Sequence, residues 1–224
     1  MVERSGAKQA GNGRGRCHVV ANLKGGVGKS TVASFLAAHL VETGRMVAVL
    51  DLDRGQGDTA RFAKLRGRGL RLITASEDPA KIYDEVDQLL KEGWEVVVDT
   101  PPGESKAAKL ACYMATAVIM PVRPGTNDVA AIGRLMEMAA IIRQERADLK
   151  VLTLCNFFKT SKEATLMVEL LKSMANATFV GRIADRKDYS SALAEGKTPW
   201  EHVPGKPAAE EMQAICAALD RMVG

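Results

Sequence analysis

The sequence has few aromatic residues, few histidines and few cysteines. Phe, Trp and Tyr make up 4% of the 224 residues, so the core of the fold must be built from aliphatic side chains. The four cysteines are far apart and form no CxxC pair, and there are three histidines. This spacing favours buried, reduced thiols over a disulfide framework or a zinc site.

Long apolar runs are also absent. No run in the sequence approaches the roughly 18 apolar residues that a membrane-spanning helix needs. Residues 1–16 contain no hydrophobic segment of the kind found in a secretory signal. We therefore expect a cytoplasmic protein that does not enter a membrane.

The net charge is small, +4 at pH 7, and much of it comes from the N-terminus. Residues 1–16 carry four basic side chains and one acidic one, and they lack apolar periodicity. We expect a flexible basic tail over residues 1–16, followed by one domain over residues 17–224. Because the rest of the chain is nearly neutral, any binding of nucleic acid must come from a local patch of positive charge.

Short apolar runs alternate with helical patterns along the predicted domain. The runs cover residues 17–22, 46–50, 70–75, 94–99, 117–121, 151–156 and 178–180. The helical patterns cover residues 30–41, 79–91, 105–114, 129–142, 161–174 and 208–222. Strands that are apolar throughout are buried on both faces, as in a parallel sheet. The alternation predicts an α/β fold, a doubly wound and mostly parallel sheet flanked by helices.

A glycine-rich loop follows the first predicted strand and precedes the first predicted helix. It reads KGGVGKST over residues 24–31 and has the spacing of a Walker A phosphate-binding loop. Glycines let the backbone approach phosphate closely, and a helix N-terminus favours an anion. We expect Lys29 to reach the β- and γ-phosphates and Ser30 to bind Mg²⁺. The predicted ATP-binding residues of the loop are Lys24, Gly25, Gly26, Val27, Gly28, Lys29, Ser30 and Thr31.

Lys24, at the front of this loop, makes the sequence resemble the ParA/MinD superfamily of deviant Walker A ATPases. An ordinary phosphate-binding loop does not need a lysine there. The resemblance covers residues 17–223 and is closest to short ParA-type ATPases that partition plasmids or position other cargo. It implies a P-loop NTPase fold, hydrolysis of ATP with Mg²⁺, a homodimer that forms with ATP, and catalytic roles for Lys24 and Lys29.

Two further segments resemble the switch regions of that superfamily. In VAVLDLD, Asp51 and Asp53 stand two residues apart at the end of a strand, so both carboxylates lie on one face at the ligand-binding edge of the sheet. The resemblance implies that Asp53 positions the attacking water and that Asp51 supports Mg²⁺. In WEVVVDTPPG, Asp99 ends a strand like a Walker B acid that binds a Mg²⁺-coordinated water.

Two amide side chains accompany these motifs. Asn156 ends the predicted strand 151–156 and resembles the residue that reads the adenine edge in relatives, because an amide can both donate and accept. An ordinary asparagine at a strand end is an equal alternative. Many relatives read DxDPQ, whereas Arg54 and Gly55 precede Gln56 here, which leaves Gln56 open as a site residue.

Basic residues late in the chain occupy the region through which relatives bind nonspecific DNA. The candidates are Lys159, Arg182, Arg186, Lys187 and Lys197. Acidic residues interleave with them, so a mixed, solvated surface is the alternative. A second basic segment, residues 61–71, contains no acidic residue and is either the rim of a turn or an extra DNA contact.

The resemblance also implies partners and a location. We expect nonspecific DNA and a ParB-like or other cargo adaptor as partners, and association with the nucleoid, with a plasmid as the first cargo to test. A MinD-like positioning ATPase is a poorer match, because residues 210–221 are acidic and rich in alanine, unlike a membrane-binding helix. An ATP-dependent metabolic ligase or synthetase on the same fold would need a further substrate-binding region, for which the chain leaves little length.

Overall fold

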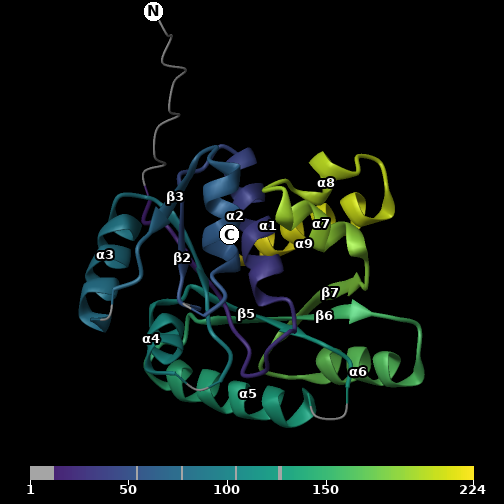
Figure 1. The fold of residues 1–224 in the computed structure, drawn as a ribbon. Helices are drawn as coiled ribbons and strands as arrows, with labels where there is room; N and C mark the ends of the chain where they lie inside the picture. Colours follow the sequence, from purple (N-terminus) through teal and green to yellow (C-terminus); the bar gives the residue numbers. More distant parts are fainter. Residues whose placement is uncertain (1–12, 54, 77, 104, 126–127) are drawn as a thin grey trace, which may run out of the picture.

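A parallel β-sheet forms the centre of the computed structural model, which describes residues 13–53, 55–76, 78–103, 105–125 and 128–224 (Figure 1). Its strands are β1 Cys17–Val20, β2 Val47–Asp51, β3 Leu70–Ile73, β4 Glu95–Asp99, β5 Ala117–Val122, β6 Lys150–Phe158 and β7 Thr178–Ala184. They lie in the order β3-β2-β4-β1-β5-β6-β7, and each neighbouring pair is parallel. The predicted doubly wound parallel sheet is confirmed.

Helices cover both faces of the sheet (Figure 1). One face carries α1 Lys29–Glu42, α2 Asp58–Arg66, α7 Lys187–Ala194, α8 Pro199–His202 and α9 Pro207–Val223. The other face carries α3 Pro79–Lys91, α4 Lys106–Met114, α5 Asp128–Glu145 and α6 Lys162–Ser173. Within the described ranges, no helix combines the length and the apolar character that crossing a membrane would require.

Two apolar cores lie on opposite faces of the sheet because side chains alternate along each strand. In β2, Val47 and Val49 belong to the core beneath α1 and α9, whereas Ala48 and Leu50 belong to the core beneath α3 and α4. All four side chains are buried. Aliphatic residues dominate both cores, as the scarcity of aromatic residues predicts.

Side-chain caps define where some helices begin. The Ser105 hydroxyl accepts the N–H of Ala108 at the start of α4, and the Ser161 hydroxyl accepts the N–H of Ala164 at the start of α6. Loss of such a cap typically costs about 1 kcal/mol. The cap at Ser105 holds α4 directly after the loop that follows β4, so it also fixes one side of the ligand-binding edge.

Three helices, α2, α7 and α8, lie where the sequence predicts none. Much of the basic segment 61–71 belongs to α2, which ends at Arg66 before a left-handed Gly67 with φ of 60°. The segment is therefore mostly helix and only partly a turn. Strand β7 extends to Ala184, beyond the predicted end at residue 180.

The predicted N-terminal tail is only partly described. Residues 1–12 lie outside the described residues. Within the rest, the N–H of Gly15 donates to the carbonyl of Leu90 at 2.7 Å, and the carbonyl of Arg16 accepts the N–H of Val96 at 2.8 Å. Residues 15 and 16 are thus hydrogen-bonded to the domain, which the predicted boundary at residue 17 leaves out.

The order in which the strands are added to the sheet reverses at its centre. Strand β1 lies between β4 and β5, and the connections to β2 and β5 leave the centre of the sheet toward opposite sides. In open α/β sheets, ligands bind outside the carboxyl ends of strands at such a point. The carboxyl ends of β1, β2 and β4 all meet there because the strands are parallel.

Candidate functional site

The loop between β1 and α1 has the backbone geometry of a phosphate cradle. Gly26 and Gly28 have left-handed φ angles of 70° and 88°. Gly28 is the N-cap residue of α1 and offers no side-chain cap, so the first N–H groups of the helix face the loop. Free N–H groups and the helix dipole favour an anion at this position.

Asn22 and Lys29 fix the inside of this loop. Asn22 donates through Nδ2 to the carbonyl of Pro121 at 2.8 Å and accepts the N–H of Lys24 at 2.9 Å. The buried Lys29 donates through Nζ to the carbonyl of Lys24 at 3.3 Å. Burial lowers the pKa of Lys29, and the carboxylate of Asp99 acts in the opposite direction. The Lys29 ammonium therefore lies inside the loop, where a bound phosphate would meet it.

Asn156 packs directly against the phosphate loop. Its Nδ2 donates to the carbonyl of Val27 at 2.8 Å, and its Oδ1 accepts the N–H of Phe157 at 2.9 Å. A Cβ atom on Gly28 would lie 2.0 Å from Asn156 Nδ2, so only glycine fits there. The amide supports the loop in this structure, and its contact with adenine stays a prediction.

Asp51 holds the backbone that leads from β2 into α2. Its Oδ1 accepts the N–H of Asp53, and its Oδ2 accepts the N–H of Ala60, both at 2.9 Å. Burial raises the pKa of Asp51, and these two N–H groups act against the rise. Asp51 is also the register partner of Asp99 in the β2–β4 pair, so the two carboxylates end neighbouring strands.

Asp99 is completely buried beside the phosphate loop. Its Oδ2 accepts the hydroxyl of Thr59 at 2.7 Å, whereas its Oδ1 has no hydrogen-bond partner in the part of the chain that the structure describes. Burial raises the pKa of Asp99 to about 7, and the hydroxyls of Ser30 and Thr59 act against the rise. A buried carboxylate with an open oxygen is costly unless a cation compensates it.

These oxygen atoms fit a magnesium ion. Mg²⁺ prefers hard oxygen donors and is usually held by one or two carboxylates together with substrate phosphates. Asp99 Oδ1 and the hydroxyl of Ser30, at the start of α1, are donors of this kind. The described residues contain no group of three or more His, Cys, Asp or Glu side chains that could hold a metal ion. The donor set therefore suits Mg²⁺ bound together with a nucleotide phosphate.

Asp53 folds back onto its own loop. Its Oδ1 accepts the N–H groups of Gly55 at 3.2 Å and of Gln56 at 3.4 Å, and its carbonyl accepts the N–H of Gly57 at 2.8 Å. Gln56 is exposed, and Arg54 lies outside the described residues. The role of Asp53 toward an attacking water stays a prediction.

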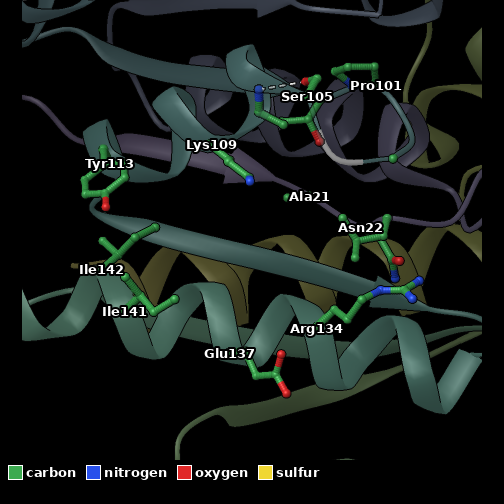
Figure 2. A pocket seen from close by; sticks show the side chains of 14 residues that line it. Ala21, Asn22, Pro101, Ser105, Lys109, Tyr113, Arg134, Glu137, Ile141 and Ile142 are labelled. Carbon is green, nitrogen blue, oxygen red and sulfur yellow. Dashed lines mark hydrogen bonds between the residues drawn. The ribbon is translucent and has the colours of Figure 1, made fainter.

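A pocket of about 370 Å³ adjoins the phosphate loop without being part of it. Figure 2 shows Lys109 and Tyr113 on α4 facing Arg134 on α5 across this space. The residues that follow β4 form one wall, and the N–H of Gly103 there donates to the carbonyl of Leu23 at 2.8 Å. A ligand in the pocket would therefore touch residues 21–23, which lead into the phosphate loop, and the loop after Asp99.

The predicted DNA contacts do not gather in one place. Lys159 directly follows β6, Arg182 lies in β7, and Arg186 and Lys187 stand at the start of α7. Lys197, in contrast, follows the far end of α7. Lys159 pairs with Asp185 at 2.8 Å, and Lys197 pairs with Glu195 at 2.9 Å. Such surface pairs contribute about 0–1 kcal/mol, so they would not prevent a contact with phosphate.

Two arginines of that set have other partners. The guanidinium of Arg182 lies 4.6 Å from the ring centroid of Phe158, and Arg186 Nε lies 3.6 Å from Glu211 Oε1. Arg186 also precedes α7 as its N-cap residue. The exposed Lys187 begins α7. Contact of any of these residues with DNA stays a prediction.

Thr59 is a site residue that the sequence motifs do not reveal. It is completely buried in α2, and its hydroxyl bonds the carboxylate of Asp99. No motif marks this position. The available signal is Gly57 followed by Asp58, a helix start directly after the acidic loop, which would have brought the first turn of α2 to the site.

Phosphate loops between a strand and a helix, with strand-end carboxylates beside them, define the P-loop nucleotide-binding domains, and this protein is one of that class. Comparison with family models agrees: the model described as the CobQ/CobB/MinD/ParA nucleotide binding domain matches residues 18–200. Since this span is most of the chain, the protein belongs to that family. The ParA/MinD membership predicted from Lys24 is confirmed.

Curated relatives cover nearly the whole chain. The chromosome-partitioning ATPase Soj of Thermus thermophilus is 28% identical, over 88% of this chain and 92% of its own length. The maintenance of carboxysome distribution protein A of Halothiobacillus neapolitanus is 27% identical, over 88% of this chain and 92% of its own length. The septum site-determining protein MinD of Escherichia coli K12 is 25% identical, over 81% of this chain.

Solved structures of similar fold include a putative plasmid partition protein from Borrelia burgdorferi bound to AMPPNP. It has a TM-score of 0.74 and 20% identity, and the match covers 93% of this chain and 100% of that one. The apo McdA structure from Cyanthece has a TM-score of 0.72 and 20% identity, covering 90% and 98%. At this identity the likeness shows the fold alone, and it confirms the P-loop NTPase architecture.

Proposed function

We propose that this protein is a ParA-like ATPase that forms a homodimer with ATP, binds DNA without sequence preference and partitions or positions a cargo. The observation that carries the proposal is Lys24, a second lysine in a loop whose phosphate side Lys29 already serves. Membership of the ParA/MinD family supports the nucleotide, and the names of Soj and McdA support partition or positioning.

Different site residues would bind the phosphates of ATP, hold Mg²⁺ and position the attacking water. The N–H groups from Gly25 to Thr31 bind the phosphates, and Lys29 contacts the β- and γ-phosphates. Ser30 and Asp99 hold Mg²⁺, which neutralises charge on the phosphate oxygens. Asp51 supports this arrangement through the backbone that it binds, and Asp53 orients the attacking water.

Lys24 and the partners would complete the cycle. The dimer closes when ATP is bound and then associates with the nucleoid through DNA phosphates. A ParB-like or other adaptor on the cargo stimulates hydrolysis and releases the dimer. A plasmid is the first cargo to test, and the protein would act in the cytoplasm, on the nucleoid.

The first experiment compares nucleotide binding with phosphate release in two variants. Lys29→Ala should lose ATP binding, because it removes the cation that meets the phosphates. Asp53→Ala should keep ATP binding and lose hydrolysis, because the contacts with phosphate come from the phosphate loop and not from Asp53. The wild-type protein should turn over ATP slowly until DNA and the adaptor are added. Turnover of tens per second by the protein alone, a typical enzyme rate, would contradict the proposal.

The pocket beside the phosphate loop favours a second function, an ATP-dependent ligase or synthetase. Its volume of about 370 Å³ and the cations Lys109 and Arg134 would suit a small carboxylic acid. The discriminating measurement is ATP turnover with a panel of small dicarboxylic acids against turnover with DNA and adaptor. Stimulation by the acids alone would support the second function.

A further inference from the structure

A stripe of positive charge runs along the outer face of α2. The segment 61–71 contains five basic residues and no acidic one. Arg61 and Lys64 are exposed on successive turns of the helix, and Arg68 is exposed just after its end. These three residues are called the α2 stripe below. Residues three or four apart on a helix are neighbours, so the stripe presents its charges on one side.

The stripe has no acidic partners among the described residues. Arg61, Lys64 and Arg68 form no ion pair there. The neighbouring Arg66, in contrast, bonds Glu42 at 2.8 Å and Glu201 at 2.7 Å. Glu42 and Glu201 are thus paired with Arg66, and the three charges of the stripe have no ion-pair partner among the described residues.

The turn between α7 and α8 lies against the end of the stripe. A Cβ atom on Gly196 would lie 2.7 Å from Leu65 Cβ and 2.9 Å from the N atom of Arg66, so the turn packs directly on α2. Arg68 and Lys197 line one hollow of about 330 Å³. Figure 1 shows the end of α2 and α8 at the same end of the molecule. Lys197, which follows the far end of α7 from Arg186 and Lys187, is therefore a neighbour of the stripe.

We propose that the α2 stripe, together with Lys197, binds the phosphate backbone of nucleic acid. Guanidinium groups bond phosphate oxygens in pairs, and contacts with phosphate alone give binding without sequence preference. A lipid surface suits the stripe less well, because Leu65 is the one large apolar side chain exposed on α2. The inference rests on the proposed function, and it names the surface through which the protein would bind DNA.

The helix that carries the stripe also begins at the nucleotide site. Its first turn is held by two hydrogen bonds, from Ala60 N–H to Asp51 at 2.9 Å and from the Thr59 hydroxyl to Asp99 at 2.7 Å. The nine residues of α2 span about 13 Å, so one short rigid element joins the two sites. Any movement of Asp99 on binding metal and phosphate would reach the stripe, which makes its affinity for DNA depend on nucleotide.

The test measures binding of a labelled duplex of arbitrary sequence by fluorescence anisotropy, with AMPPNP and Mg²⁺, across a salt series. The variant Arg61→Glu/Lys64→Glu/Arg68→Glu should bind at least about tenfold more weakly, with a slope of log K against log salt that is lower by about 2 to 3, because each phosphate contact contributes roughly 0.9. The matched control Lys81→Glu/Lys91→Glu/Lys172→Glu changes the net charge equally on α3 and α6 and should keep the wild-type slope.

A second variant guards against misfolding. Arg61→Gln/Lys64→Gln/Arg68→Gln removes the charge without reversing it, and it should weaken DNA binding while AMPPNP still binds as in the wild type. If both stripe variants keep the wild-type affinity and slope, the proposed role of the stripe in DNA binding is wrong, and the proposed function of the protein is unaffected. Equal weakening in the control would show that binding follows net charge, which also overturns the stripe.

Two outcomes concern the wild-type protein itself. Absence of DNA binding in every nucleotide state would overturn the proposed function and, with it, the stripe. Binding to vesicles that contain anionic lipid, lost in the stripe variants while DNA is not bound, would assign the surface to a membrane instead. Either result differs from failure of the stripe alone, in which the wild-type protein binds DNA and the variants match it.

Discussion

The three aspartates at the ligand-binding edge differ in what surrounds each carboxylate. Asp51 uses both oxygens on backbone N–H groups, and Asp53 uses one on its own loop. Asp99 is fully buried, and one of its oxygens has no hydrogen-bond partner among the residues that the structure describes. The environment of Asp99 suits direct contact with a cation, whereas that of Asp51 suits positioning of the backbone. Neither aspartate should therefore be able to replace the other.

The Thr59 hydroxyl should matter for metal binding although it is not a ligand. Thr59→Val removes the hydroxyl that donates to Oδ2 of the buried Asp99 carboxylate. We expect the Mg²⁺ concentration for half-maximal ATP turnover to rise by about 10-fold or more, as for other residues that orient metal ligands. The free energy of unfolding should fall by about 1–3 kcal/mol.

Thr59→Ser is the matched control, because it keeps the hydroxyl and removes only a methyl group. A magnesium titration of ATP turnover separates the two roles of Thr59, since a purely structural residue would change stability without moving the midpoint for Mg²⁺. An unchanged midpoint in Thr59→Val, with wild-type behaviour in Thr59→Ser, would show that the hydroxyl does not position Asp99.

Two glycines of the phosphate loop differ in a way that a stability measurement can detect. Gly26 and Gly28 both have left-handed φ angles, 70° and 88°. An added Cβ would meet nothing within 4 Å at Gly26 but would lie 2.0 Å from Asn156 Nδ2 at Gly28. Gly26→Ala should therefore cost only the conformational strain of about 1–2 kcal/mol, and Gly28→Ala clearly more. Urea unfolding of the two variants checks this, and equal losses would be inconsistent with the packing of Asn156.

At the scale of single elements, the sequence predicts the strands better than the short helices. Strands β2 and β4 contain uninterrupted apolar stretches, residues 47–50 and 96–98, because both faces are buried, and this pattern is visible without a structure. Helix α2 buries only Thr59, Phe62 and Ala63, so its apolar periodicity is weak and its basic residues dominate the sequence. A tertiary contact holds α2 in place, because the carboxylate of Asp51 accepts the N–H of Ala60 in its first turn.

The candidate site also contains residues that the sequence predicts and residues that it does not. The phosphate loop and the strand-end aspartates are contiguous motifs, so their residue types and spacing predict them. Thr59 and Asn22 act through contacts with Asp99 and Pro121, which lie 40 and 99 residues away in the chain. Contacts of that kind depend on how the strands are ordered in the sheet, and no local pattern in the sequence encodes that order.

The turn after α7 provides an element-scale prediction. Gly196 has a φ of 66°, and an added Cβ would lie 2.7 Å from Leu65 Cβ and 2.9 Å from the backbone of Arg66. Gly196→Ala should push this turn away from α2 and lower the free energy of unfolding by about 1–3 kcal/mol beyond the strain itself. Gly205→Ala is the control, since Gly205 has a φ of 72° with nothing within 4 Å of the added atom. Denaturant unfolding measures the loss of stability in both variants. Similar losses in the two would count against direct packing of Gly196 on α2.

At the scale of the whole molecule, Lys24 should act in a dimer. Lys29 already occupies the inside of the phosphate loop, so a second lysine at its front has a use if it neutralises ATP held by the facing subunit. A charge-assisted contact that exists only with nucleotide present would link ATP occupancy to association. Lys24→Ala should therefore bind ATP nearly as the wild type does and remain monomeric.

Light scattering with ATP and Mg²⁺ tests the role of Lys24 in a background that does not hydrolyse. The single variant Asp53→Ala should form an ATP-dependent dimer and serves as the control. The double variant Lys24→Ala/Asp53→Ala should stay at the mass of one chain. A dimer of normal affinity in the double variant would make Lys24 an ordinary loop lysine.

The burial of the cysteines has a practical consequence for following α2 by spectroscopy. All four thiols are buried, and burial raises the pKa of each one. Because the thiolate is the reactive form, a maleimide dye should label the native protein only slowly. Lys64→Cys would add one exposed thiol on the stripe. A single fluorophore could then be attached there without first removing any natural cysteine, and its emission would report whether α2 moves when nucleotide binds.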